Sequence, residues 1–358
     1  MLDGQPQIVG DFLAETRERQ AAFLRELVRV PSDNPPGDCA AHGARAAELL
    51  EELGFEVERH PLPDELCREH GMVSATNLIV RHRFSNAGPT VVLNAHGDVV
   101  APGDGWTVDP YGGEVIDGWM YGRGVAVSKS DFATYAFALL ALKQSGLPLA
   151  GAVELHFTYD EEVGGHLGPR WILEQGLSKP DLVISAGFSY SVVTAHNGCL
   201  HLEVTVRGKS AHAARPDTGH DALAAATLAL SALYALRADL AKIVSDIEGI
   251  GSPGLTVGLI RGGINTNVVP DKVTFRLDRR MIPEEDADKV EAELRALIEG
   301  AVAHLDGIRV EIERVMRARP LAPLPGVETA VDALQRHAAA TFETEIPVLG
   351  VPLYTDAR

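Results

Sequence analysis

The chain has 358 residues, more than a single hydrophobic core ordinarily serves, so two domains are expected. Apolar residues make up 46% and charged residues 23% of the sequence, a composition typical of soluble globular proteins. The net charge of −18 argues against nucleic acid and anionic membranes as partners.

The N-terminal segment and the cysteine pattern do not indicate secretion. The first ten residues contain no basic segment and no apolar core, so no signal peptide is predicted, and no apolar run approaches the ~20 residues of a membrane span. Cys39, Cys67 and Cys199 are odd in number and scattered, which indicates a reducing compartment without a disulfide framework. None has the close spacing of a zinc knuckle. We therefore expect a cytoplasmic protein.

The first part of the chain alternates between predicted helices and strands. Helical patterning covers residues 8–30, 40–53 and 130–145, and a further helix ends at 171–175. Short runs at 55–60, 77–81, 90–95, 152–158 and 182–186 predict strands, of which 90–95 and 152–158 are apolar enough to be covered on both faces. This alternation predicts an α/β domain with a mixed, largely parallel sheet between helices.

The pattern changes near Gly198. Residues 200–207 alternate as a one-sided strand does, and they begin the order strand, helix, strand, strand, helix, strand at 200–207, 221–236, 254–260, 272–279, 284–299 and 309–314. That order is typical of a ferredoxin-like α+β layer. A helix at 328–342 and a strand at 348–353 then return to the first pattern. We predict an α/β domain of residues 1–197 and 317–358, into which residues 198–316 are inserted.

Two polar groups follow the two buried strands. His96-Gly97-Asp98 ends one, and Asp160-Glu161-Glu162 ends the other, at the sheet edge where α/β domains place ligand-binding groups. Asp98 can hold the far ring nitrogen of a metal-bound His96 and fix its tautomer. Of the adjacent glutamates, one can bind a metal while the other, its pKa raised by burial or by its neighbour, accepts a proton. Taken singly, each group also fits an ordinary acidic turn.

Longer motifs around these groups favour a functional site. They are His96-Gly97-Asp98-Val99-Val100, Gly103-x-x-Trp106-x-x-Asp109-Pro110, Gly118-x-x-Tyr121-Gly122-Arg123-Gly124, Tyr159-Asp160-Glu161-Glu162-x-Gly164-Gly165, Val206-Arg207-Gly208-Lys209-Ser210-Ala211-His212-Ala213 and Gly262-Gly263-Ile264-Asn265-Thr266-Asn267-x-x-Pro270. Together they resemble the two-zinc peptidase and deacylase family of aminoacylase, acetylornithine deacetylase and succinyl-diaminopimelate desuccinylase. The resemblance extends from about Phe12 to the last residue.

The resemblance implies roles for the residues of the α/β domain. His96 would be a metal ligand, with Asp98 as its orienting partner. Glu161 would be the general base that activates water, and Glu162 would be a ligand to the second metal. The α/β domain would therefore be the catalytic one.

For the inserted domain, the resemblance implies a lid that also forms a homodimer. His212 would reach across the dimer and stabilise the oxyanion in the neighbouring subunit's site. Asn267 and Arg280 would bind the backbone or the carboxylate of a small substrate.

The chain departs from the family at several expected metal ligands. Val127 stands where an aspartate would bridge both metals, and Ala186 is the nearest match to a further acidic ligand. The final ligand, a histidine downstream of a motif like Thr355-Asp356-Ala357-Arg358, would lie beyond Arg358, so we expect a fragment or an incomplete gene model.

A substitute ligand would restore part of this site. Asp131 lies four residues after Val127 near a helix start and could share its face. Asp160 and His166 are weaker candidates and are more simply ordinary surface residues.

We predict a metal-dependent hydrolase of amino-acid metabolism that cleaves an amide bond in an N-acyl amino acid or a dipeptide. Zinc is the expected metal, with manganese and cobalt as alternatives, and one or two ions per subunit are left open. Two alternatives stay open: a metal-deficient binding protein that keeps Asn267 and Arg280, and a mononuclear hydrolase of an unusual C–N bond, of the deaminase type. The substrate cannot be read from the motifs, because one fold serves many substrates.

Overall fold

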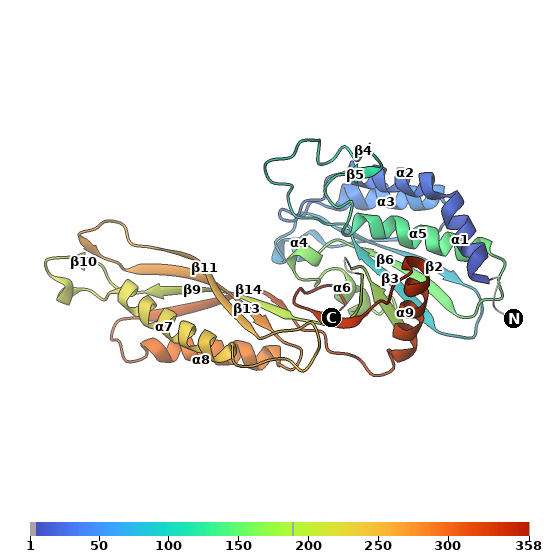
Figure 1. Ribbon diagram of the computed structural model, residues 1–358. Helices are drawn as coiled ribbons and strands as arrows, with labels where there is room; N and C mark the ends of the chain where they lie inside the picture. The colour runs from blue at the N-terminus through green and yellow to red at the C-terminus, as the bar shows by residue number, and fades with distance from the viewer. Residues whose placement is uncertain (1–4, 188–189, 358) are drawn as a thin grey trace. The chain divides into compact units, whose positions relative to one another are not determined.

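The computed structural model describes residues 5–187 and 190–357 (Figure 1). Met1 to Gly4, within the segment judged to lack a signal peptide, lie outside the described residues, as do Phe188, Ser189 and Arg358. The chain divides into two compact units, residues 1–189 with 355–357 and residues 190–354.

The first unit is built on a five-stranded mixed sheet. Its strands, in spatial order, are β1 (Val57–Pro61), β2 (Thr76–Arg83), β6 (Ala152–Thr158), β3 (Thr90–His96) and β7 (Leu182–Ser185). β3 runs parallel to β6 and β7, whereas β2 is antiparallel to both β1 and β6. Only β2 therefore opposes the other strands, which confirms the predicted mixed, largely parallel sheet.

Six α-helices belong to the described part of this unit: α1 (Gln5–Glu15), α2 (Arg17–Val28), α3 (Ala40–Glu52), α4 (Asp64–Glu69), α5 (Lys129–Gln144) and α6 (Pro169–Glu174). Phe132 of α5 stacks on Phe157 of β6, with ring centroids 3.9 Å apart, and both side chains are buried. This contact packs α5 against β6. It also places the first turn of α5 near the end of the sheet where β3 and β6 stop.

The single helix predicted at residues 8–30 was wrong in its continuity, because α1 and α2 meet at Thr16. The Thr16 hydroxyl donates to the carbonyl of Phe12 (2.8 Å), and the Gln20 side-chain amide donates to the carbonyl of Leu13 (2.8 Å). Leu13 is the residue whose carbonyl would accept from residue 17 in a continuous helix. Polar side chains that bond to the backbone in this way compete with the helical ladder.

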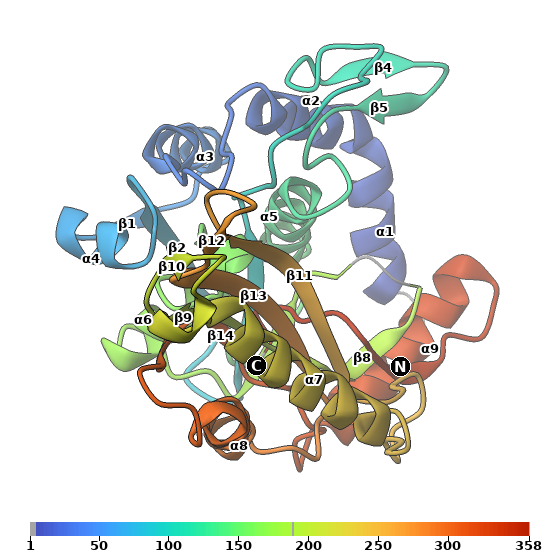
Figure 2. The ribbon, with the colours of Figure 1, turned by 90° about the vertical axis from the view of Figure 1, so that its left-hand side faces the viewer.

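The second unit contains a four-stranded antiparallel sheet in the order β11 (Gly254–Gly262), β13 (Lys272–Met281), β9 (Gly198–Arg207) and β14 (Arg309–Ala318). Helices α7 (Ala222–Leu240) and α8 (Ala287–Val302) pack side by side against this sheet (Figure 2). Each helix begins at an aspartate whose carboxylate accepts from two backbone N–H groups, Asp221 before α7 and Asp286 before α8. This is the predicted ferredoxin-like βαββαβ arrangement.

Further elements belong to neither sheet. In the second unit they are the parallel pair β8 (Val192–His196) and β15 (Val348–Val351), helix α9 (Glu328–Phe342), and the short strands β10 (Ala211–His212) and β12 (Val268–Val269). The hairpin β4 (Glu114–Ile116) and β5 (Trp119–Tyr121) belongs to the first unit. The second unit is thus larger than the predicted insertion of residues 198–316, whose boundaries stay a prediction.

One expectation from the sequence needs correction, because α7 is long and apolar enough to cross a membrane by length and composition. The predicted helix of 221–236 ended too early to meet that criterion. In the structure α7 buries one stripe against the sheet, formed by Ala222, Ala225, Ala226, Ala229, Leu233 and Leu240. A stripe at this spacing is typical of a helix that packs on a sheet through one face.

Candidate functional site

The two polar motifs of the first unit meet at one edge of the sheet. His96 is the last residue of β3 and pairs with Thr158, the last residue of β6, in the parallel ladder. The Gly97 N–H continues this ladder and donates to the Thr158 carbonyl (2.8 Å). Because the two parallel strands end side by side, the residues at and after their ends lie close together at one edge of the sheet. His96 and Glu161 are therefore neighbours.

Asp98 organises the segments around this edge. Its carboxylate is fully buried and accepts from the backbone N–H groups of Glu161 (3.3 Å) and Glu162 (3.1 Å), and from the side-chain amide of Asn34 (2.9 Å). Asp98 Oδ1 also lies 3.4 Å from His96 Nδ1, whose closest partner is the Asp98 carbonyl at 2.9 Å. One carboxylate therefore fixes the loop of both glutamates and the orientation of the imidazole.

Gly97 is required by close packing beneath this loop. A Cβ atom at this position would lie 2.5 Å from Tyr159 Cε1 and 3.1 Å from both His42 Cε1 and Phe132 Cζ. All three rings belong to buried side chains. His96 and Asp98 can therefore flank this turn only if the residue between them has no side chain.

We expect Gly97→Ala to lower the free energy of unfolding by about 1–3 kcal/mol, because overpacking a closed core forces side chains from their preferred rotamers. Chemical denaturation of the metal-free protein measures this difference. Gly251→Ala is the matched control, since nothing lies within 4 Å of its added Cβ. Equal stabilities of the two variants would show that the rings beneath Gly97 move aside freely.

The motifs bring three metal-binding side chains together. One ligand atom from each of His96, Glu161 and Glu162 lies within 4.8 Å of the others. His96 is buried, while both glutamates are partly buried in the short 3-10 turn Glu161–Val163. An imidazole nitrogen and carboxylate oxygens are donors that suit zinc and manganese.

The electrostatics of the site favour a cation. Burial, together with the neighbouring carboxylates of Asp356, Asp98 and Glu162, raises the pKa of Glu161 to about 8 against the opposing effect of His96. Burial also raises the pKa of Glu162. Burial lowers the pKa of His96, but Asp98, Glu161 and Asp356 outweigh it and raise this pKa to about 10.

These shifts have two physical origins, burial of the ionisable groups and an excess of carboxylates around a single imidazole. A divalent cation among them would neutralise their charge, lower the pKa of each group and leave His96 neutral, as a ligand must be. The donor set at this edge of the sheet therefore fits one divalent cation.

The positions of the expected additional ligands offer no donor. Val127 lies in the turn before α5, and Ala186 directly follows β7, where its N–H donates to the Asn94 carbonyl of β3 (2.8 Å). The backbone thus brings Ala186 to the edge of the sheet that carries His96. The side chain of neither residue can bind a metal.

Asp131 does not share a helix face with Val127, contrary to the prediction, because α5 begins at Lys129 and Val127 precedes it. Asp131 instead accepts from the Ser128 hydroxyl (3.2 Å). Burial raises the pKa of Asp131 to about 6, and Ser128 and His96 oppose this shift. Its carboxylate is close enough to His96 to feel its charge, although it does not belong to the three-residue group.

Two further residues of this site were not identified from the sequence. Asn34 lies in the loop before α3 and donates to Asp98. Asp356 raises the pKa of both His96 and Glu161 through its negative charge. Asp356 belongs to the Thr-Asp-Ala-Arg motif. The sequence around this motif did not indicate that the segment belongs to the same compact unit as β3.

The weaker candidates have structural roles. The expectation that Asp160 is an ordinary surface residue was wrong, because its side chain is buried and accepts from the backbone N–H of Leu167 in the loop that follows β6. His166 lies against His70, with ring centroids 5.3 Å apart.

Arg123 also contributes to the electrostatics of the site. Its guanidinium stacks over Trp106 at 5.6 Å, and its charge opposes the raised pKa of Glu162. The two glycine-rich motifs that contain Arg123 and Trp106 therefore fold together next to the carboxylates.

The predicted residues of the second unit form two separate groups. His212 and Asn267 are exposed neighbours, because His212 belongs to β10, which pairs with β12, and the Ala213 N–H donates to the Asn267 carbonyl (2.9 Å). Arg280 lies near the other end of β13, where its Nε atom donates to Asp278 (3.0 Å). The structure thus brings His212 and Asn267 together but separates both from Arg280.

The chain is similar to known hydrolases over most of its length. A family model described as Peptidase family M20/M25/M40 matches residues 92–358. Succinyl-diaminopimelate desuccinylase from Rhodospirillum centenum is 29% identical over 289 residues, which cover 78% of this chain and 72% of that protein.

Solved structures share the fold. An M20 family metallo-carboxypeptidase from Sulfolobus solfataricus has a TM-score of 0.74 at 18% identity, and covers 95% of this chain with 86% of its own. Aminopeptidase PepT from Bacillus cereus has a TM-score of 0.70 at 22% identity, with the same coverage of 95% and 86%. Both comparisons extend across the two units.

Proposed function

We propose that this chain, which belongs to peptidase family M20/M25/M40 and is a metallohydrolase acting on amide bonds, cleaves a small substrate that carries a carboxylate, such as an N-acyl amino acid or a dipeptide. The observation that carries this proposal is the buried group of His96, Glu161 and Glu162 at the ends of β3 and β6, with Asp98 behind it.

These residues divide into ligands and a proton carrier. His96 and Glu162 would hold a divalent cation, most simply zinc, and Asp98 would orient the imidazole through its Nδ1 edge. When bound, the cation supplies Lewis acidity that polarises the substrate carbonyl and favours ionisation of water. Asp131 and Asp356 are the nearby carboxylates that could complete its coordination.

Glu161 is the proposed general base. It would accept a proton from the attacking water and deliver it to the leaving nitrogen. Burial and the surrounding carboxylates already raise its pKa, so its proton affinity can be set near neutrality once a cation offsets part of their charge. A hydrogen-bond donor such as His212 would stabilise the oxyanion that forms.

The second unit supports a homodimer for geometric reasons. A β-strand rises about 3.3 Å per residue, so Arg280 lies about 26 Å along β13 from Lys272. His212 and Asn267 lie beyond the Lys272 end (Figure 1). One small substrate cannot contact both groups of the same chain. If all three residues bind substrate, His212 and Asn267 must come from one subunit and Arg280 from the other.

The substrate class follows from the desuccinylase relative. Its name describes removal of a succinyl group from an amino acid, and N-succinyl amino acids are therefore the first substrates to test. Such a reaction would belong to amino-acid metabolism. We place the protein in the cytoplasm, where its three buried cysteines would remain reduced.

The test is hydrolysis of a panel of N-succinyl, N-acetyl and N-carbamoyl amino acids and dipeptides by protein loaded with zinc, manganese or cobalt. We expect turnover of at least one class, and its loss on chelation. Metal uptake without turnover of any substrate would overturn the proposal. Thermal stabilisation by carboxylate ligands without metal uptake would favour the binding-protein alternative.

A further inference from the structure

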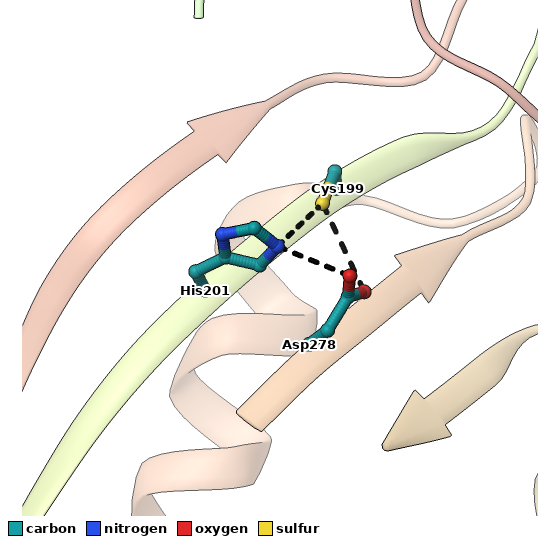
Figure 3. Close-up of side chains that lie close together, drawn as sticks. All are labelled: Cys199, His201 and Asp278. Atoms are coloured by element: carbon teal, nitrogen blue, oxygen red, sulfur yellow. Dashed lines mark hydrogen bonds and ion pairs between the residues drawn. The ribbon is translucent and has the colours of Figure 1, made fainter. Parts of the chain in front are cut away.

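A second cluster of metal-binding side chains lies on the sheet of the second unit. It consists of Cys199 and His201 on β9 and Asp278 on β13 (Figure 3). The cluster belongs to a different compact unit from His96, Glu161 and Glu162, and none of its three residues has an assigned role in the proposed hydrolysis.

The register of two antiparallel strands creates this cluster. Asp278 lies directly opposite His201, and Arg280 lies opposite Cys199. Because alternate side chains of a strand share a face, Cys199 and His201 point to the same side of β9. The intervening Leu200 and Leu202 join the core beneath α7 and α8. The cluster therefore occupies the face of the sheet that the helices do not cover.

The distances within the cluster match a tetrahedral ion. Cys199 Sγ lies 3.3 Å from His201 Nε2 and 3.8 Å from Asp278 Oδ1, and His201 Nε2 lies 3.1 Å from Asp278 Oδ2. Zinc bonds of about 2.3 Å to sulfur and about 2.0–2.2 Å to nitrogen and oxygen imply ligand separations of roughly 3.4–3.6 Å at tetrahedral angles. One carboxylate oxygen of Asp278 lies near the sulfur and the other near the imidazole, so small side-chain shifts would bring one ligand atom of each residue onto one ion.

The surroundings supply the other features of a metal site. The side chains of His201 and Asp278 are 35% and 31% exposed, which gives an ion a path from solvent and a fourth position for water. Cys199 is buried beneath them. Arg280 Nε donates to Asp278 Oδ1 (3.0 Å), and such a bond orients a coordinating carboxylate.

We propose that Cys199, His201 and Asp278 form a second transition-metal site, selective for zinc or another thiolate-binding ion. A sulfur, nitrogen and oxygen donor set favours Zn²⁺ over Mg²⁺ or Ca²⁺, which bind oxygen ligands. Binding would release the thiol proton of Cys199, because the thiolate is the ligand. The ion would tie β9 to β13.

Cobalt provides a test that isolates this site. A bound cobalt ion shows a thiolate-to-metal charge-transfer band only where a cysteine is a ligand, and the group of His96, Glu161 and Glu162 contains no sulfur. We expect chelator-stripped full-length protein to develop this band with Co²⁺, to saturate at one thiolate-bound ion per chain, and to lose it when Zn²⁺ is added.

Variants assign the band to its ligands. Cys199→Ser is expected to abolish it, and His201→Gln and Asp278→Asn to weaken the affinity for Co²⁺ at least tenfold. Cys67→Ser is the matched control and should leave it unchanged, since Cys67 is a buried cysteine of the first unit. If Cys199→Ser does not fold, His201→Gln on the part-exposed face provides the same test.

The second site would be overturned if wild-type protein showed no band at saturating Co²⁺. It would also be overturned if the band persisted in Cys199→Ser, or if His201→Gln bound Co²⁺ with unchanged affinity. None of these results would affect the proposed hydrolase, whose metal is read from activity.

Discussion

Replacement of Glu161 with glutamine is expected to lower kcat by about 10²–10⁴-fold, the usual contribution of a positioned general base. Glutamine keeps the shape of the side chain and the backbone N–H that donates to Asp98, but it cannot accept a proton. The measurement is kcat at saturating substrate and metal, with the metal content of each preparation determined.

The same substitution should have the opposite effect on stability. Burial and three neighbouring carboxylates raise the pKa of Glu161, so the folded metal-free protein is destabilised by that carboxyl group at neutral pH. Glutamine removes this cost and should raise the Tm of protein held in a chelator. A variant that lost both activity and Tm would indicate a structural role for Glu161.

Glu162→Gln is the matched comparison, because it changes the adjacent residue of the same turn. If Glu162 is a metal ligand, this variant should need more metal to reach half-maximal activity and should recover kcat at high metal concentration. Equal behaviour of the two variants would contradict the assignment of different roles.

The location of the site could be predicted because it depends on local sequence. The apolar runs that become β3 and β6 identify buried strands, and polar residues directly after such strands lie at the ligand-binding edge. Gly97 between His96 and Asp98 could be recognised as part of a motif. The ring packing that requires a glycine there became visible only in the structure.

Contacts between distant segments could not be predicted in this way. His201 and Asp278 are 77 residues apart, and only the register of β9 against β13 makes them partners. Asp356 lies far from His96 in the sequence yet raises its pKa, and no periodicity predicts that proximity of charges. The break between α1 and α2 at Thr16 could not be predicted either. The apolar spacing of a helix continues through it, but side-chain hydrogen bonds to the backbone interrupt the helix.

The positions of the expected metal ligands also show what a motif can and cannot predict. Val127 and Ala186 can be recognised as positions without a donor from the motif alone, and the structure places Ala186 at the edge of the sheet that carries His96. The replacement by Asp131 was reasoned from helical spacing, which failed because the turn before α5 is not helical. The identity of a residue can be read from a motif, whereas the direction of its side chain depends on the local backbone.

Loss of the Asp98 carboxylate is expected to have the largest effect on both folding and metal binding. Asp98 accepts from two backbone N–H groups and from Asn34, all at a fully buried position. In Asp98→Ala these donors would lose their acceptor together, and each buried donor without a partner costs about 1–3 kcal/mol. We expect the free energy of unfolding to fall by about 3–5 kcal/mol.

Asp98→Asn removes the charge of Asp98 but keeps the shape of its side chain, so it distinguishes the effects of the two. The amide can still accept one of these hydrogen bonds, so the loss of stability should be smaller than for alanine, but His96 would lose its anionic partner. Loss of such an orienting partner typically weakens metal binding about 10–100-fold. Denaturant unfolding and metal titration measure the two effects, with Asp104→Asn, an exposed residue of the same loop, as the control. Wild-type metal affinity in Asp98→Asn would mean that the Asp98 carbonyl, which lies 2.9 Å from His96 Nδ1, orients the imidazole by itself.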